Sequence, residues 1–234
     1  MYSDAFCKVY NEFGWNYFPE AFGEQLIVWL ERRGFAPRSA LDLGCGTGVL
    51  CEAMHAAGMD VRGMDLSQGM IDIARSRNGH IHYDVADMLT YHPGKTFDLI
   101  TCTGDALNHI LDLSDVDIIL KNIYGWLNPG GCFLFDILCE KEVPSSDPIE
   151  LPFSDEVTAY FHITQDKGII ALSTTVYEKG EKAFEEKITE TVHDADAICS
   201  MLKNAGFVNI TRAHQLLDDI HSDSSTWYIS AEKA

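Results

Sequence analysis

Two kinds of hydrophobic spacing alternate along much of this chain. Short, nearly continuous apolar runs, such as 39–43 and 97–102, are separated by stretches in which apolar residues recur every three or four positions. After residue 48, such positions are Val49, Leu50, Ala53, Met54 and Ala57. Continuous apolar runs are typical of strands buried on both faces, and the wider spacing is typical of an amphipathic helix. The pattern therefore predicts an α/β fold in which strands and helices alternate.

The same pattern gives the expected order of elements. The predicted strands are 39–43, 60–64, 80–85, 97–102, 132–137, one that opens at 207, and 226–231. The predicted helices that follow or separate them begin at residue 49 and cover 68–77, 113–127 and 194–205. Asn128-Pro129-Gly130-Gly131 is a turn signature that ends the helix before the strand at 132.

Two regions depart from this alternation. Residues 1–38 are expected to form an amphipathic helical cap that Pro37 ends, and its first half is rich in aromatic residues. This cap either packs on the sheet or closes over a site as a flap. Residues 140–193 contain three strand-like runs, 157–165, 169–178 and 184–193, joined by turn-like segments. We expect a three-stranded antiparallel sheet, inserted between 39–139 and 194–234, that serves as a lid or a dimerisation surface.

The chemistry-bearing motif lies between the first strand and the first helix after it. It reads Leu41-Asp42-Leu43-Gly44-Cys45-Gly46-Thr47-Gly48. Glycine permits positive φ and close approach to a ligand, and the helix that follows offers free N–H groups. The dinucleotide fingerprint would place a third small residue at position 49, where this chain has Val49.

This acidic-x-Gly-x-Gly-x-Gly string resembles motif I of the class I S-adenosylmethionine-dependent methyltransferases. Leu-x-Pro-Gly-Gly before the fifth strand is similar to the same family. The resemblance implies a doubly wound, mostly parallel seven-stranded sheet of order 3-2-1-4-5-7-6, with strand 7 antiparallel. It also implies S-adenosylmethionine as cofactor and S-adenosylhomocysteine as product. The inserted sheet is similar in kind to that of sugar-amine N-methyltransferases.

The resemblance assigns cofactor-binding roles along the chain. Asp42 would favour the positive charges of the cofactor, and Asp65, at the end of the second strand, would accept hydrogen bonds from the ribose hydroxyls. An N-cap role for Asp65 is the alternative, although Ser67 could fill it. The full predicted set is Tyr10, Tyr17, Asp42, Gly44, Cys45, Gly46, Asp65, Leu66, Asp87, Met88, Thr103 and Asn108.

The loop after the fourth strand carries the catalytic candidate. In the resembled family this loop faces the methyl group that is transferred, and here it contains Asp105, Asn108 and His109. His109 is the candidate general base, because histidine titrates near neutral pH. The alternative is a structural histidine that starts the next helix.

Composition limits the partners. The 17 Lys and Arg residues against 36 acids give a net charge of -19, which disfavours nucleic acid and anionic membrane surfaces. The seven cysteines form no Cys-x-x-Cys pair, so no metal site is expected, and unpaired thiols suit the cytoplasm. No signal peptide or membrane-spanning run is seen.

The sequence thus predicts an enzyme that moves a methyl group to a small-molecule acceptor, at N or O rather than C or S. A monomer and a homodimer are both compatible with it. Two alternatives remain: a non-catalytic protein that binds S-adenosylmethionine, and an NAD-dependent oxidoreductase, against which Val49 argues.

Overall fold

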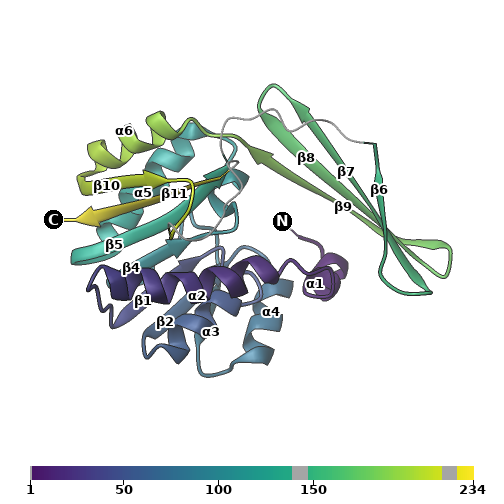
Figure 1. Ribbon diagram of the computed structural model, residues 1–234, viewed down its shortest axis with the longest axis horizontal. Helices are drawn as coiled ribbons and strands as arrows, with labels where there is room; N and C mark the ends of the chain where they lie inside the picture. Colours follow the sequence, from purple (N-terminus) through teal and green to yellow (C-terminus); the bar gives the residue numbers. More distant parts are fainter. Residues whose placement is uncertain (1, 139–146, 218–225) are drawn as a thin grey trace.

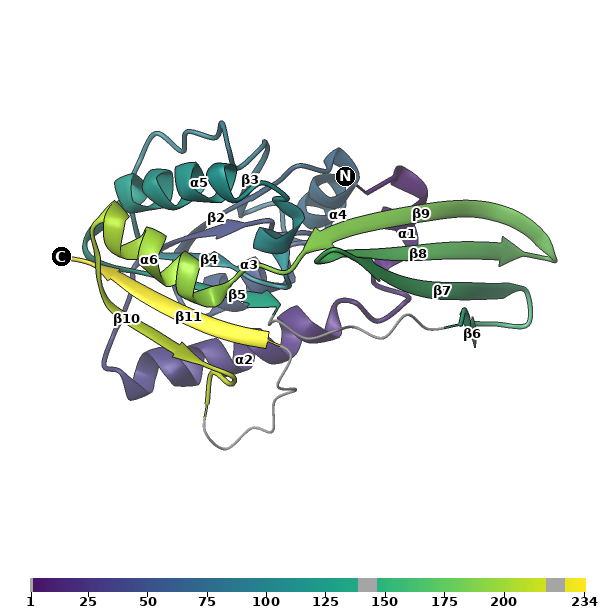
Figure 2. The same ribbon diagram turned by 90° about the horizontal axis from the view of Figure 1, so that it is seen from above.

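The protein has two lobes, an α/β lobe and an extended antiparallel sheet (Figures 1 and 2). The computed structural model describes residues 2–138, 147–217 and 226–234. Within these ranges, no helix is both long enough and apolar enough to cross a bilayer. Segment α1 lies beside the gap between the two lobes in Figure 1, so both lobes and the N-terminal region meet at one place.

The α/β lobe is built on a seven-stranded sheet of order β3-β2-β1-β4-β5-β11-β10. Strand β11 runs antiparallel to both of its neighbours, and the pairs among β1 to β5 are parallel. The predicted fold class and strand order are therefore confirmed. The strands are β1 (Ser39–Leu43), β2 (Asp60–Asp65), β3 (His82–Val85), β4 (Phe97–Cys102), β5 (Leu127–Leu138), β10 (Phe207–Ala213) and β11 (Thr226–Lys233).

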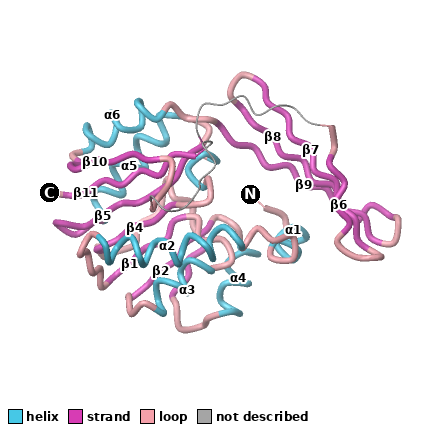
Figure 3. Tube along the Cα trace, viewed as in Figure 1, coloured by secondary structure: helices cyan, strands magenta, loops and turns pink. Residues whose placement is uncertain are grey.

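Helices cover both faces of this sheet (Figure 3). One buried cluster joins the sheet to α5 (Leu113–Trp126) and α6 (Ala195–Ala205). A second cluster joins its other face to α2 (Tyr17–Arg32), α3 (Val49–Ala56) and α4 (Gln68–Arg77). Each fully buried Leu or Phe in these clusters contributes about 1.5–3 kcal/mol, so the two cores hold the sheet rigidly.

Strand β5 begins earlier than its sequence predicts. The stretch from Asn128 to Gly131, expected to be a turn, lies inside the strand as an irregularity. Phe97 pairs with Leu127 whereas Leu99 pairs with Cys132, so β5 accommodates extra residues opposite β4. The turn residues do bend the backbone, but the sheet continues across the bend.

The second lobe has four strands, and the predicted three-stranded sheet is wrong in this respect. They are β6 (Ile149–Pro152), β7 (Val157–Asp166), β8 (Ile169–Glu178) and β9 (Glu181–Thr191), antiparallel in that order. The missed strand β6 contains a proline, which argues against a central strand but is tolerated at a sheet edge. Residues 140–146 of the predicted insertion lie outside the described ranges.

The N-terminal region is helical, as expected, but it is divided. Helix α1 (Asp4–Tyr10) contacts both α4 and β9, and a turn separates it from α2. The Phe13 ring lies 4.2 Å from that of Phe153 and 6.0 Å from that of Phe161, centroid to centroid. The aromatic cluster thus packs partly against the inserted sheet.

Candidate active site

The turn between β1 and α3 brings bare backbone to the carboxyl edge of the sheet. Gly46 has φ +52°, and a Cβ built there would meet no atom within 4 Å, so it faces open space. Gly48 has φ +80°, and a Cβ there would stand 2.6 Å from the Tyr83 hydroxyl, so packing requires this glycine. The N–H of Cys45 donates to the Met64 carbonyl at 2.9 Å, which ties the turn to β2.

Asp65 fixes the other side of the turn. Its carboxylate accepts the N–H of Gly46 at 2.9 Å and the N–H of Ser67 at 2.8 Å. Ser67 is the N-cap of α4, and its hydroxyl accepts the N–H of Met70. Burial raises the pKa of Asp65, while the two backbone donors act against that shift. The carboxylate retains free lone pairs for further donors.

Asp42 lies deeper, beneath the glycine turn, and is 3 % exposed. It accepts hydrogen bonds from the Thr101 hydroxyl at 2.7 Å and from the Cys51 thiol at 3.5 Å. Burial raises the pKa of Asp42 to about 7. Both carboxyl oxygens of Asp42 are therefore hydrogen-bonded inside the lobe, although the residue also forms part of the cavity wall.

A single cavity of about 640 Å³ opens from the glycine turn towards the inserted sheet. Its walls come from the ends of the parallel strands, from the N-terminal region and from β9, which places it at the junction of the two lobes. Most of the predicted residues line it, namely Tyr10, Asp42, Gly44, Cys45, Gly46, Asp65, Leu66, Asp87, Met88, Thr103 and His109.

Comparison with known proteins identifies a methyltransferase domain in this chain. Residues 40–131 match a family model described as a methyltransferase domain. The malonyl-acyl-carrier-protein O-methyltransferase of Salmonella typhimurium is 28% identical over 193 residues, which cover 82% of this chain and 72% of that protein. Residues 40–131 thus form a methyltransferase domain, and the relatives support an S-adenosylmethionine-dependent methyltransferase.

Solved structures share the fold of this methyltransferase. An S-adenosylmethionine-dependent methyltransferase from Clostridium acetobutylicum superimposes with a TM-score of 0.82 at 22% identity, covering 98% of both chains. CalS10, an amino pentose methyltransferase from Micromonospora echinaspora, gives a TM-score of 0.76 at 18% identity and covers 100% of this chain and 98% of its own. The similarity thus extends over the inserted sheet as well as the α/β lobe.

Two predicted residues of the methyltransferase lie outside the cavity wall. Tyr17 is 72% exposed, and its neighbours Trp15 and Phe18 line the cavity instead. Asn108 is fully buried, and its side-chain amide donates to the Thr191 carbonyl at 2.7 Å and accepts the Leu138 N–H at 3.1 Å. The structure therefore gives Asn108 a structural contact between the end of β9 and the end of β5.

The loop after β4 is shaped by a second buried carboxyl group. Asp136, at 1 % exposure, accepts the N–H of Gly104 at 3.1 Å and of Asp105 at 3.0 Å. Asp105 has φ +58° and lines the cavity. Burial raises the pKa of both carboxyl groups, and their mutual repulsion raises that of Asp136 further. The methyltransferase thus keeps two acids close together beside the predicted catalytic loop.

His109 lies in the 3₁₀ turn η1 (Ala106–His109) and faces three groups. Its Nε2 atom is 3.4 Å from the Tyr2 hydroxyl and 3.6 Å from a carboxylate oxygen of Glu190. Its Nδ1 atom is 3.4 Å from the Thr189 carbonyl oxygen. Burial lowers the pKa of His109, so the imidazole is neutral at pH 7. His109 lines the cavity, and its catalytic role stays a prediction.

Several cavity residues were missed by the sequence reasoning, above all Tyr2, Glu186 and Glu190. The N–H of Ser3 donates to the Glu186 carboxylate at 3.2 Å, which fastens the N-terminal segment to β9. The alternation within β9 is visible in the sequence, but it does not show which of the two faces is turned inward.

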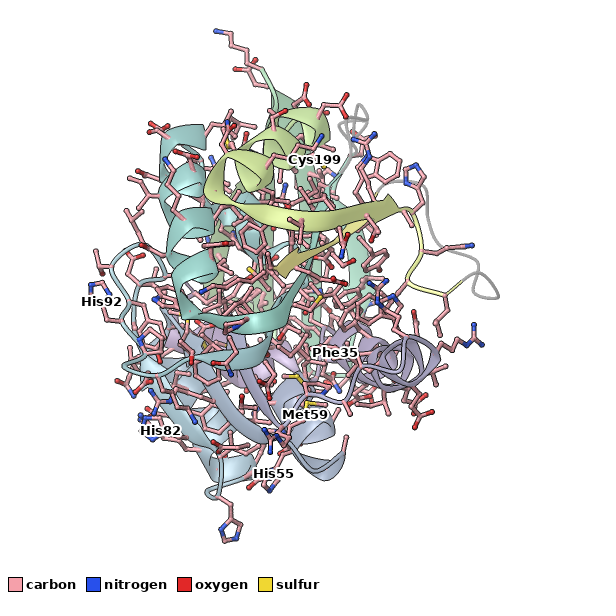
Figure 4. All side chains as sticks on the ribbon, turned by 90° about the vertical axis from the view of Figure 1, so that its left-hand side faces the viewer. Phe35, His55, Met59, His82, His92 and Cys199 are labelled. Carbon is pink, nitrogen blue, oxygen red and sulfur yellow. The ribbon has the colours of Figure 1, made fainter. Side chains whose placement is uncertain are left out.

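Three other histidines of the methyltransferase lie outside the cavity wall. Figure 4 views the side opposite the inserted sheet and shows His55, His82 and His92 at the periphery, where all three are exposed. Over the described residues, no group of three or more His, Cys, Asp or Glu side chains is placed to hold a metal ion.

Proposed function

We propose that this enzyme transfers the methyl group of S-adenosylmethionine to a nitrogen or oxygen atom of a small molecule. The observation that supports this is the continuity of the cavity, which joins the glycine turn and the acid of β2 to His109 and β9 without a dividing wall. Donor and acceptor can then lie together in one cavity, and proximity of this kind contributes a large part of the rate in bimolecular reactions.

The residues present fit the cofactor. The open backbone at Gly46 admits the methionine part, and Asp65 offers carboxylate lone pairs to the ribose hydroxyls. Leu66, Asp87 and Met88 line the same end of the cavity and would hold the adenine. S-adenosylmethionine supplies a methyl group already activated by its sulfonium charge. The enzyme's own task is to align the acceptor and to exclude water.

The acceptor we propose is small and neutral or cationic. The net charge of -19 disfavours nucleic acid and anionic surfaces, and the cavity wall adds Asp105, Glu186 and Glu190 to that field. The named relatives act on different acceptors: the Salmonella protein is a malonyl-acyl-carrier-protein O-methyltransferase, and CalS10 is an amino pentose methyltransferase. Neither name fixes the acceptor of this enzyme.

Calorimetric titration with S-adenosylmethionine, S-adenosylhomocysteine and NAD tests the first step. We expect micromolar binding of the first two and none of NAD. A screen of small amines and alcohols, followed by release of S-adenosylhomocysteine, then tests turnover. Binding without turnover on any acceptor would favour the non-catalytic alternative, and binding of NAD alone would refute the proposal.

A further inference from the structure

Strand β9 places a second titratable group, the carboxylate of Glu190, close to His109. Glu186, Ile188 and Glu190 occupy alternate positions of β9 and line the cavity. Lys187 and Thr189 also line it, whereas Glu185 is exposed and lies outside the cavity wall. A Glu190 oxygen lies 3.6 Å from His109 Nε2, and the two residues belong to different lobes. The docking of the inserted sheet therefore creates this pair.

The hydrogen bonds of His109 decide its tautomer, and therefore whether the ring nitrogen near Glu190 can accept a proton. The Thr189 carbonyl can only accept, so His109 Nδ1 carries the proton that it donates there. In the neutral ring, Nε2 then has a free lone pair, directed towards Glu190 and the Tyr2 hydroxyl. A proton arriving on Glu190 can be shared with this nitrogen.

No Lys or Arg of the described ranges forms an ion pair with Glu190, although Lys187 of the same strand also lines the cavity. Among the described residues, His109 is the one basic side chain within 4 Å of its carboxylate. The groups that face it from neighbouring elements are Asp105, Tyr2 and Tyr10, with Glu186 further along β9. A half-buried carboxylate among acids and phenols attracts a cation more strongly than an exposed one.

We propose that Glu190 is a catalytic residue that binds the ammonium group of an amine acceptor and takes its proton. The proposal rests on the proposed function, because it concerns the acceptor end of the same cavity. His109 is a positioning residue in this scheme: once Glu190 has taken the proton, the Nε2 lone pair of His109 accepts a hydrogen bond from the neutral carboxylic acid and shares that proton.

The step balances without a further reactant. The acceptor arrives as R–NH₃⁺ and passes one proton to the Glu190 carboxylate, which leaves R–NH₂ and a neutral carboxylic acid. The nitrogen lone pair forms the new N–C bond with the methyl group. The S–C bond of the donor breaks, its electron pair stays on sulfur, and the product is R–NH₂⁺–CH₃.

The pKa of Glu190 favours an amine over an alcohol as the acceptor of the methyl group. Burial, followed by the charge of Asp105, raises the pKa of Glu190 to about 7. The equilibrium constant for proton transfer to Glu190 is then about 10⁻³ from an aliphatic ammonium of pKa near 10.4. From a water-like hydroxyl of pKa near 15.7 it is about 10⁻⁹. A phenol would lose its proton as easily as an ammonium, but the resulting anion would lie among acids.

Shape-matched probes test the assignment. Binding of cyclohexylamine and cyclohexanol is measured on the full-length protein saturated with S-adenosylhomocysteine, for wild type, Glu190→Gln and Glu185→Gln. The last variant changes the same group on the same strand but on the outward face, where Glu185 pairs with exposed Lys182. NMR titration of His109 in each protein reports on the pair directly.

We expect wild type and Glu185→Gln to bind the amine at least tenfold more tightly than the alcohol, with amine affinity rising as pH rises through about 7. In Glu190→Gln the preference falls below twofold, the pH dependence disappears, and the His109 titration moves to lower pH because a nearby negative charge is lost. Amine preference that survives Glu190→Gln, or no amine binding to the loaded protein, would overturn the assignment. Failure to bind S-adenosylhomocysteine would instead refute the proposed function.

Discussion

The two ends of the cavity are built in different ways. At the glycine turn, the contacts link residues close in sequence or on adjacent strands, such as Asp65 with Ser67 and Gly46 at 2.8 and 2.9 Å. At the inserted sheet, they link distant parts of the chain, such as Asn108 with Thr191 and Ser3 with Glu186. One end is held by backbone geometry and the other by the docking of two lobes.

This difference has a consequence for the effects of substitutions. The glycine turn is a rigid part of the α/β core, so changes there should affect cofactor affinity with little effect elsewhere. The end formed by β9 depends on a few buried polar contacts between the lobes, so changes there should affect stability and acceptor binding together. Four predictions test this contrast, from the largest expected effect to the smallest.

Gly46→Val should reduce affinity for S-adenosylmethionine by at least about 100-fold, because a side chain would enter the cavity and positive φ disfavours a β-branched residue. Calorimetric titration measures the loss. Gly58→Val is the control, since Gly58 has φ +92°, open space around it and no place in the cavity wall. Equal loss of affinity in both variants would mean that strain, and not occupancy of the cavity, causes the effect.

Asn108→Ala should lower the free energy of unfolding by about 2–5 kcal/mol, because the Thr191 carbonyl and the Leu138 N–H would both lose a buried partner. Denaturant unfolding measures this, and hydrogen exchange should show faster opening at the end of β9. Asn122→Ala, in α5, removes only a 3.4 Å contact with Leu89 and serves as the control. Similar destabilisation in both would contradict the docking role of Asn108.

Asp65→Ala should weaken cofactor binding by about 1.5–3 kcal/mol, roughly 10- to 150-fold, through lost charge-assisted hydrogen bonds. Part of this loss will come from the N–H groups of Gly46 and Ser67, which lose their acceptor. Asp72→Ala, on the exposed surface of α4, should bind normally. Unchanged affinity in Asp65→Ala would remove this carboxylate from the cofactor site.

The stability of the fold should decrease as the pH rises from about 4 to about 8. Burial raises the pKa of Asp42 to about 7, and that of Asp136 also rises, so the folded state holds protons that the unfolded chain releases above about pH 4. Thermal unfolding at pH 5 and 8.5 should show a lower Tm at pH 8.5. Asp42→Asn should reduce this difference by a few degrees, whereas an unchanged difference would mean that Asp42 ionises normally.

Much of the α/β lobe was predictable because its signals are local. The spacing of apolar residues gave the strands and helices, and Ser67 and Asp194 cap the helices that follow them. Strand β6 and the early start of β5 were missed, since proline and glycine in a strand argue against it when the pairing partner is unknown. In the structure, β6 is a strand because it pairs with β7, and β5 begins early because its first residue pairs with β4.

The part of the site near the glycine turn was also predictable from local signals in the sequence. Residues of the glycine turn and the ends of β2 and β3 reach the cavity because strand ends of a parallel sheet share one edge. Tyr17 and Asn108 were assigned to the cofactor site from the resemblance alone. In the structure Tyr17 is exposed outside the cavity, and the buried Asn108 side chain is hydrogen-bonded between the ends of β9 and β5.

By itself, the sequence determined the α/β class, the strand order through its family resemblance, and the residues of the glycine turn that line the cavity, because each depends on spacing within short stretches. Only the tertiary structure decided the end of the cavity that β9 forms. His109 and Glu190 approach to 3.6 Å because the inserted sheet docks on the α/β lobe. No local pattern shows which face of β9 turns inward, since both faces of an isolated strand carry acids here.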